Sequence, residues 1–163
     1  MFYFFKKVLK RKRRELVLKN AEGIAGLGKS LYVRHVDSGS CNACEVEVAA
    51  LGNPHYSIES FGIRFVASPK HADVLLVTGC VTRNMLTALK KAYDNTPSPK
   101  WVITVGDCTE SCPFFKDSYS VEGPVSKHIP VHLHVPGCPP EPSEIISGFI
   151  RLMNLIQREK VNF

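Results

Sequence analysis

Three local patterns follow one another in the stretch Leu31-Tyr-Val-Arg-His-Val-Asp-Ser-Gly-Ser-Cys41-Asn-Ala-Cys44-Glu-Val-Glu-Val-Ala-Ala-Leu51. Its first part, Leu31–Val36, is a short apolar run typical of a strand, and its last part, Glu45–Leu51, is typical of a helix. A CxxC loop lies between them. A strand followed at once by a helix indicates a parallel α/β sheet, with two cysteines placed where the first strand ends.

Two further cysteines have the same placement. The strand-like run Trp101–Val105 leads into Gly-Asp-Cys108, and Val131–Val135 leads into Pro-Gly-Cys138-Pro-Pro. Parallel strands present their carboxyl ends along one edge of the sheet, where such sheets bind ligands. We therefore expect Cys41, Cys44, Cys108 and Cys138 to meet at that edge. Four thiolates at one place are the ligand set of an iron–sulfur cluster or of a structural zinc ion.

The rest of the chain alternates short strands with helices, as an α/β domain requires. Asp73–Val77 is a continuous apolar run, typical of a parallel strand that is buried on both faces. The sequence also predicts a weaker edge strand at Ile63–Ala67, a last strand at Pro130–Val135, helices at Asn84–Tyr93 and Ser143–Arg158, and an ordered functional loop at Thr109–Lys127. The chain of 163 residues suits one such domain, which we assign to residues 31–163.

Residues 1–30 differ from this domain in composition. Tyr3–Lys19 is predicted to be a basic amphipathic helix, and Ala21–Ser30 a Gly-rich linker. Residues 1–19 carry a net charge of +7, so that the remaining residues carry −1 of the overall +6. The pattern G-x-x-x-x-G-K-S at Gly23–Ser30 matches a phosphate-binding loop in its letters alone, because no strand precedes it and no helix follows it. Nucleotide binding is not expected.

Composition restricts the class of protein further. No run of about twenty apolar residues occurs, so no membrane-spanning helix is expected. The apolar start Met1–Phe5 is too short for the apolar core of a secretory signal and precedes the positive charges. Six cysteines in a chain of this size, without a signal, favour thiolate ligands in a reducing cytoplasm over a disulfide framework. No His-x-His metal site and no catalytic triad is assigned.

The spacing of the cysteines favours a cluster over zinc and leaves both open. A zinc ribbon brings together two close pairs, but Cys41-x-x-Cys44 and Cys108-x-x-x-Cys112 lie far apart, and Cys138 would have no role. Single cysteines in Gly-Asp-Cys108 and Gly-Cys138-Pro-Pro loops suit an iron–sulfur cluster, because glycine lets backbone amides approach the sulfurs. A zinc-stabilised nucleic-acid-binding module, with the basic arm on the nucleic acid, is the rival interpretation.

Three segments resemble the small subunits of membrane-bound, energy-converting nickel–iron hydrogenases, which are homologous to the B subunit of respiratory complex I. They are His35-Val-Asp-Ser-Gly-Ser-Cys41-Asn-Ala-Cys44-Glu-Val-Glu47, Phe61-Gly-Ile-Arg-Phe-Val-Ala-Ser-Pro-Lys-His-Ala-Asp-Val-Leu-Leu-Val-Thr-Gly79 and Val-Pro-Gly-Cys138-Pro-Pro. The resemblance extends over about Leu31 to Leu155. It implies a flavodoxin-like fold with helices on both faces of the sheet.

The resemblance also implies a site, a cofactor and partners. Cys41, Cys44, Cys108 and Cys138 would be the ligands of one 4Fe-4S cluster. The chain would relay electrons between a ferredoxin-like iron–sulfur subunit and a large subunit that holds the nickel–iron centre, for dihydrogen production or oxidation. Ion-translocating membrane subunits would complete the complex at the cytoplasmic face of a prokaryotic cell membrane. The basic arm would then contact anionic lipid or a membrane subunit, and not nucleic acid.

Some details of the resemblance leave alternatives open. The CxxC form of the first loop is the hydrogenase form, whereas the complex I subunit has two adjacent cysteines; a complex I-like or sulfur-reducing module is the alternative. Cys80 and Cys112 stand where the family usually has other residues, and each is either a structural thiol or a redox-active or ligating neighbour of the cluster. Glu47, one turn after Cys44, is either a proton-transfer or partner-contact residue or a solvated carboxylate.

Overall fold

The computed structural model describes residues 30–115 and 117–161, and the side chains up to Gln157. The predicted basic helix Tyr3–Lys19 and the Gly-rich linker lie outside the described residues, apart from Ser30. No helix in the described part of the chain is long and apolar enough to cross a membrane.

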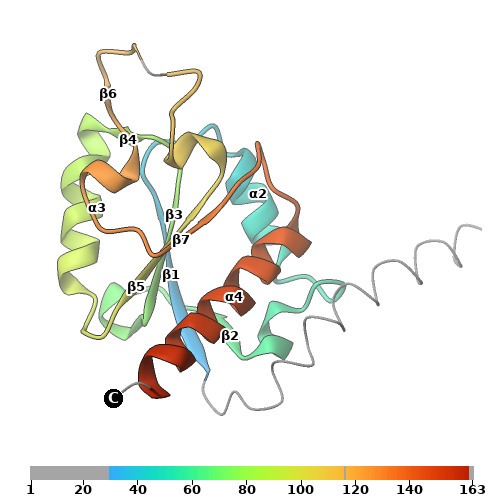
Figure 1. Cartoon of the computed structure of the whole chain (residues 1–163). Helices are drawn as coiled ribbons and strands as arrows, with labels where there is room; N and C mark the ends of the chain where they lie inside the picture. The colour runs from blue at the N-terminus through green and yellow to red at the C-terminus, as the bar shows by residue number, and fades with distance from the viewer. Residues whose placement is uncertain (1–29, 116, 162–163) are drawn as a thin grey trace, which may run out of the picture.

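A five-stranded, wholly parallel sheet forms the centre of the domain (Figure 1). Its strand order is β2-β1-β3-β5-β7, which is the flavodoxin-like order of a doubly wound α/β sheet. The strands are β1 (Leu31–Asp37), β2 (Ile63–Phe65), β3 (Val74–Thr78), β5 (Trp101–Val105) and β7 (Leu133–Val135). The parallel α/β sheet predicted from the sequence is confirmed, and β2 lies at an edge as expected.

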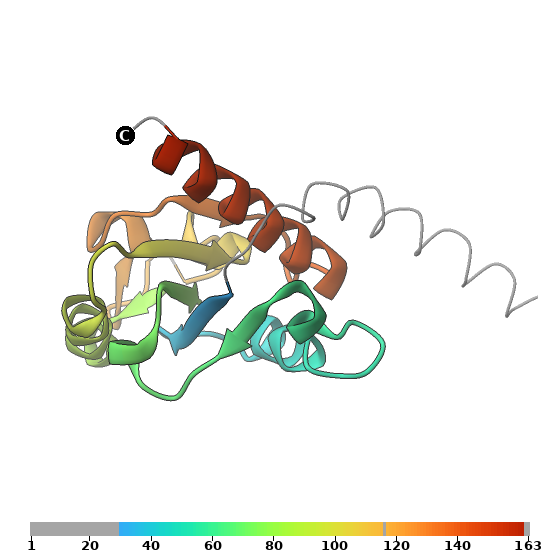
Figure 2. The ribbon, with the colours of Figure 1, turned by 90° about the horizontal axis from the view of Figure 1, so that it is seen from below.

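Helices cover both faces of this sheet (Figures 1 and 2). On one face, α2 (Ala43–Ala50) and α4 (Pro142–Val161) bury an apolar layer that includes Val48 and Phe149. On the other face, α3 (Arg83–Asn95) packs through Leu89 on a second apolar layer. The central strand β3 is buried at all five positions because its side chains enter the two layers in alternation.

The long segment predicted as a loop contains short elements of its own. β6 (Val121–Gly123) pairs antiparallel with β4 (Val81–Thr82) and forms a small ribbon above the main sheet (Figure 1). Four 3-10 helices connect the larger elements: η1 (Ile58–Phe61), η2 (Pro69–His71), η3 (Asp107–Thr109) and η4 (Val125–Lys127). Thr109–Lys127 is therefore more regular than its composition predicts.

Candidate metal centre

The four predicted ligand cysteines lie in three loops at the carboxyl edge of the sheet. Cys41 and Cys44 follow β1, with Cys44 in the first turn of α2; Cys108 lies in η3 after β5; Cys138 follows β7. Cys41 and Cys138 are exposed in the isolated chain, whereas Cys44 and Cys108 are half-buried. The topology thus brings residues that are up to 97 positions apart to one edge, as parallel strands require.

The electrostatics of these thiols show that they are neighbours. Burial, followed by the charges of Glu45, Cys41, Cys108 and Cys138, raises the pKa of Cys44 to about 12. Burial also raises the pKa of Cys108, and the next contributions come from Cys138 and Cys41. Within the described residues, no three potential ligands are grouped closely enough to hold a single metal ion. In a 4Fe-4S cluster, by contrast, each cysteine binds a different iron atom.

Gly106 makes room for the Cys44 sulfur. A Cβ atom at this position would lie 2.6 Å from Cys44 Sγ, which is too close for two non-bonded atoms. The backbone of Gly106 also has φ +94°, a conformation that L side chains rarely adopt. Glycine at 106 therefore lets the loop after β5 approach the cysteine of the loop after β1.

The loops after β1 and β3 are packed backbone against backbone. The buried Ser38 hydroxyl donates to the carbonyl oxygens of Thr78 (2.7 Å) and Gly79 (3.0 Å). A Cβ atom on Gly79 would lie 2.6 Å from the carbonyl carbon of Gly39, so only glycine fits at this contact. This junction fixes the start of the segment that carries Cys41.

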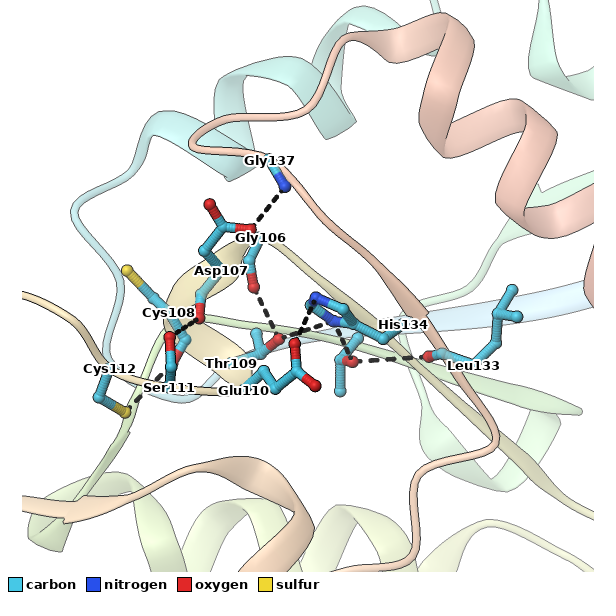
Figure 3. Close-up of polar contacts among 11 residues, drawn as sticks. Gly106, Asp107, Cys108, Thr109, Glu110, Ser111, Cys112, Leu133, His134 and Gly137 are labelled. Atoms are coloured by element: carbon cyan, nitrogen blue, oxygen red, sulfur yellow. Dashed lines mark hydrogen bonds and ion pairs between the residues drawn. The ribbon is translucent and has the colours of Figure 1, made fainter.

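The loops after β5 and β7 are joined by two hydrogen bonds between Asp107 and Gly137, and Figure 3 shows the one from the Gly137 amide to the Asp107 side chain. The Gly137 amide donates to Asp107 Oδ1 at 2.7 Å, and the Asp107 amide donates to the Gly137 carbonyl at 2.9 Å. Asp107 precedes Cys108, and Gly137 precedes Cys138. The pair therefore fixes the distance between two of the four predicted ligands.

The two remaining cysteines lie beside Cys108. Cys80 and Cys112 are each 1% exposed, and their thiols donate to the carbonyl oxygen of Cys108 at 3.3 Å and 3.1 Å. Burial, followed by the contact with Cys112, raises the pKa of Cys80, so this thiol stays protonated and can donate. The sequence leaves both roles open, and in the structure both thiols donate to the backbone carbonyl of a predicted ligand.

Two histidines, one just before β7 and one within it, have structural contacts. His132 Nδ1 accepts from the Val102 amide at 3.0 Å. His134 Nδ1 lies 3.0 Å from Thr104 Oγ1 and 3.4 Å from Thr109 Oγ1, and its Nε2 lies 3.3 Å from Glu110 Oε2 (Figure 3). His134 therefore holds the residues that follow Cys108 against β5 and β7.

Glu45, the residue after Cys44, was not predicted as a site residue from the sequence. Its side chain is 13% exposed, and neither carboxylate oxygen has a hydrogen-bond partner among the described residues. His35 Nε2 lies 4.0 Å from Glu45 Oε1 and 2.9 Å from Thr78 Oγ1. Both residues line an open groove of about 560 Å³, together with Arg34, Asp37, Val48, Ala49, Gly52, Phe65 and Val66. The only signal in the sequence was an acidic residue directly after a predicted ligand; Glu47, which was singled out instead, is half-buried on α2.

The sequence profile of one family matches residues 41–152, which contain all four predicted ligands. This family is described as "NADH ubiquinone oxidoreductase, 20 Kd subunit". The chain belongs to this family. The resemblance drawn from the sequence is thereby confirmed, since the 20 Kd subunit family includes hydrogenase subunits as well as complex I subunits.

Two similar proteins are named as subunits of a membrane-bound hydrogenase and of formate hydrogenlyase. The chain is 44% identical over 138 residues to the "Probable membrane-bound hydrogenase subunit mbhJ" of Pyrococcus furiosus, which covers 85% of this chain and 83% of the relative. It is 43% identical over 131 residues to "Formate hydrogenlyase subunit 7" of Escherichia coli, covering 80% of this chain and 51% of the relative. It thus spans about half the length of the second relative.

A solved structure supports the same assignment. The chain superimposes on a chain of the membrane-bound sulfane sulfur reductase, "an archaeal respiratory membrane complex", with a TM-score of 0.68 and 30% identity. The superposition covers 86% of this chain and 76% of the other. The chain is therefore similar to named hydrogenase subunits and also to a chain of a sulfur-reducing complex.

Proposed function

We propose that Cys41, Cys44, Cys108 and Cys138 bind one 4Fe-4S cluster and that the chain is the electron-transfer subunit of a membrane-bound nickel–iron hydrogenase complex. The observation that carries this proposal is the meeting of four thiols from three loops at the carboxyl edge of the sheet, where three of them act on the pKa of the fourth. The donor set consists of cysteines alone, which is the usual ligand set of a 4Fe-4S cluster.

The local structure fits a cluster of this kind. Gly106 leaves space beside Cys44, and the contacts of Asp107 with Gly137 hold the Cys108 and Cys138 loops together. When bound, a 4Fe-4S cluster accepts and donates one electron at a time. The chain holds the four thiolates, limits access of water through half-buried Cys44 and Cys108, and supplies hydrogen bonds near the sulfurs, and these features set the reduction potential. The chemistry on hydrogen belongs to the partner that carries the nickel–iron centre.

The face that carries Cys41 and Cys138 is the proposed contact with the large subunit. Both cysteines are exposed in the isolated chain, and a cluster bound there would be open to water without a partner. Large apolar side chains are also exposed in the nearby helix α2 and in the loop before β6, namely Val46 at 57%, Phe114 at 76% and Tyr119 at 85%. Such side chains are common at the centres of protein interfaces.

The remaining partners follow from the same proposal. A ferredoxin-like iron–sulfur subunit would exchange electrons with the cluster, and ion-translocating membrane subunits would couple the reaction to the membrane, with the complex on its cytoplasmic face. Residues 1–30 would form a separate basic arm that contacts anionic lipid or a membrane subunit. The relatives in membrane-bound hydrogenase and formate hydrogenlyase complexes support this setting.

A second candidate is a sulfur-reducing or quinone-reducing module with the same cluster. The 30% identity to a chain of the sulfane sulfur reductase favours this alternative. The sequence of the companion large subunit distinguishes the hydrogenase from this alternative. Two CxxC pairs in that subunit, able to hold nickel and iron, support the hydrogenase, whereas their absence supports the alternative acceptor.

The test of the proposal is the iron and acid-labile sulfide content of the anaerobically purified full-length chain, with an EPR spectrum after reduction by dithionite. About four iron and four sulfide per chain and the signal of a reduced cluster are expected for a 4Fe-4S centre. One zinc per chain, no sulfide and no EPR signal would contradict the proposal and favour a zinc-stabilised binding module.

A further inference from the structure

Two buried thiols that are not proposed as ligands meet at one backbone oxygen. Cys80 lies between β3 and β4, and Cys112 lies four residues after Cys108. Both side chains are 1% exposed, so neither thiol is available to solvent in the described structure. Each donates to the carbonyl oxygen of Cys108, Cys80 at 3.3 Å and Cys112 at 3.1 Å. A carbonyl oxygen has two lone pairs, so these two donors use its full capacity.

The backbone at Cys112 supports a specific role for its side chain. Cys112 has φ +49°, in the left-handed region that costs an L residue roughly 1 kcal/mol or more and that glycine adopts freely. A non-glycine residue persists in this region only where its surroundings hold it there. Here its thiol is buried and donates to the Cys108 carbonyl, and its neighbour Phe115 donates its amide to the Cys112 carbonyl at 3.1 Å.

Cys80 joins two loops of the site. The loop after β3 is fixed to the loop after β1 through Ser38 and Gly79, and the loop after β5 is fixed to the loop after β7 through Asp107 and Gly137. The thiol of Cys80 donates to the Cys108 carbonyl oxygen. It thereby connects the first pair of loops to the second pair, at the neighbouring strands β3 and β5. The loops after β1, β3, β5 and β7 are thus each linked to the next one, in the same order as these strands have in the sheet.

We propose that Cys80 and Cys112 are positioning residues that hold the Cys108 peptide through a pair of S–H donors, which we call the thiol clamp. The assignment deepens the proposed function, on which its effect on a cluster rests. The thiol clamp fixes the peptide unit that follows a ligand cysteine, and it places the positive ends of two S–H dipoles next to that ligand.

This arrangement has a definite electrostatic consequence. Reduction adds a negative charge to a cluster, and donor hydrogens near a ligand favour the more negative state. Removing either thiol leaves the negative end of the buried Cys108 carbonyl dipole with one donor instead of two. Reduction then becomes less favourable, so the midpoint potential is expected to shift to a more negative value.

The experiment compares alanine and serine at both positions in the full-length chain. Cys80→Ala and Cys112→Ala remove one donor each, whereas Cys80→Ser and Cys112→Ser keep a hydroxyl donor. Val81→Ala is the matched control, because Val81 is fully buried beside Cys80 and has no polar group to donate. Iron and sulfide content is measured first, and EPR-monitored redox titration then gives the midpoint potential of each variant.

The expected result is a negative shift in each alanine variant, a larger shift in the double variant, and potentials close to wild type in the serine variants and in Val81→Ala. Cluster loss in the alanine variants, with retention in the serine variants, would likewise support the thiol clamp. Equal potentials in all variants would overturn it. So would loss of the cluster in Cys80→Ser to the extent seen in Cys138→Ser, because Cys80 would then be a ligand.

A second measurement does not depend on the cluster. In the metal-free chain, the infrared S–H stretching band of hydrogen-bonded thiols lies below that of free thiols. Cys80→Ala and Cys112→Ala should each remove part of the low-frequency component, and an unchanged band would overturn the thiol clamp. If the wild-type chain contains no iron and sulfide, the proposed function fails, and this band still decides whether the clamp exists.

Discussion

The amide of Gly137 donates to Asp107 Oδ1 at 2.7 Å, and the amide of Asp107 donates to the carbonyl of Gly137 at 2.9 Å. These two residues each precede a predicted ligand, Cys108 and Cys138, in loops that follow neighbouring strands. A reciprocal pair of this kind removes most of the freedom of one loop relative to the other. The position of the Cys138 sulfur therefore depends on the side chain of Asp107.

Replacing Asp107 tests this dependence. Asp107→Ala leaves the Gly137 amide without its side-chain acceptor, which is expected to cost about 1–3 kcal/mol of unfolding free energy. Asp107→Asn keeps an acceptor oxygen and should lose less. Urea unfolding of the two variants gives the stability difference, and the rate of iron release under air reports on the loop. If alanine and asparagine had the same stability and iron release as wild type, the Asp107–Gly137 pair would have no role in the site.

Gly106→Ala addresses the space beside Cys44. The added Cβ would lie 2.6 Å from Cys44 Sγ and would sit on a residue with φ +94°, so both sterics and backbone conformation oppose it. We expect most of the cluster to be lost, with a smaller loss in Gly52→Ala, where the nearest atom to an added Cβ is 3.7 Å away. The iron and sulfide content per chain measures the loss of cluster in each of the two variants. Wild-type content in Gly106→Ala would show that the close approach is not needed.

The pH dependence of stability should report on His35. Burial lowers the pKa of His35 below its usual value of 6.5, and the raising effects of Glu45 and Asp37 do not offset it. The unfolded chain then binds this proton at a higher pH than the folded chain does. The free energy of unfolding therefore falls as the pH drops below 6.5, by at most about 1.4 kcal/mol per pH unit for one proton.

The variant His35→Gln removes this titration, so its free energy of unfolding should change less with pH between about pH 7 and pH 5. Urea unfolding at a series of pH values gives the slopes. His71→Gln, at an exposed histidine in η2, is the matched control and should keep the wild-type slope. Parallel curves for wild type and His35→Gln would mean that another group carries the dependence.

Much of the fold could be predicted because its signals are local. Trp101–Val105 has the same bounds in the prediction and in the structure, since it is an apolar run between a Pro-rich turn and a glycine. The ribbon of β4 and β6 could not be predicted. Its strands are two and three residues long and form only because the loop after η3 returns to pair with the residues that follow β3, so no periodic pattern marks them.

The candidate site also has a part that could be predicted from the sequence and a part that could not. The placement of the four cysteines at one edge of the sheet follows from parallel topology, so it can be predicted from the residue pattern. The contacts of Cys80 and Cys112 with the Cys108 carbonyl depend on a left-handed backbone at Cys112 and on the path of the loop after η3. The burial of Glu45 likewise depends on side-chain packing around α2. Neither arrangement can be derived from the residue pattern alone.

A matched pair of serine variants separates ligand from non-ligand cysteines. Cys138→Ser should destroy the cluster or convert it to a smaller form, because serine replaces a thiolate ligand. Cys112→Ser should leave iron and sulfide content near wild type, since the hydroxyl keeps the contact with the Cys108 carbonyl. Equal loss in both variants would show that the assignment of ligands is wrong.

The proposed partner face can be tested without disturbing the cluster. Phe114 and Tyr119 are 76% and 85% exposed, and their loop lies at the end of the sheet that carries the cysteines (Figure 1). Replacing both by serine removes apolar area that a partner would bury, at a cost of roughly 1 kcal/mol or more per side chain in binding. We expect at least a tenfold loss of affinity for the large subunit, with unchanged iron and sulfide content.

Leu155→Ser provides the control for this change. Leu155 is 42% exposed in the later part of α4, which runs away from the cysteine edge (Figure 1). Co-purification and titration with the large subunit should therefore give wild-type affinity for this variant. An equal loss in Leu155→Ser and in the Phe114/Tyr119 double variant would point to a general loss of stability, whereas wild-type affinity in the double variant would place the partner on another face.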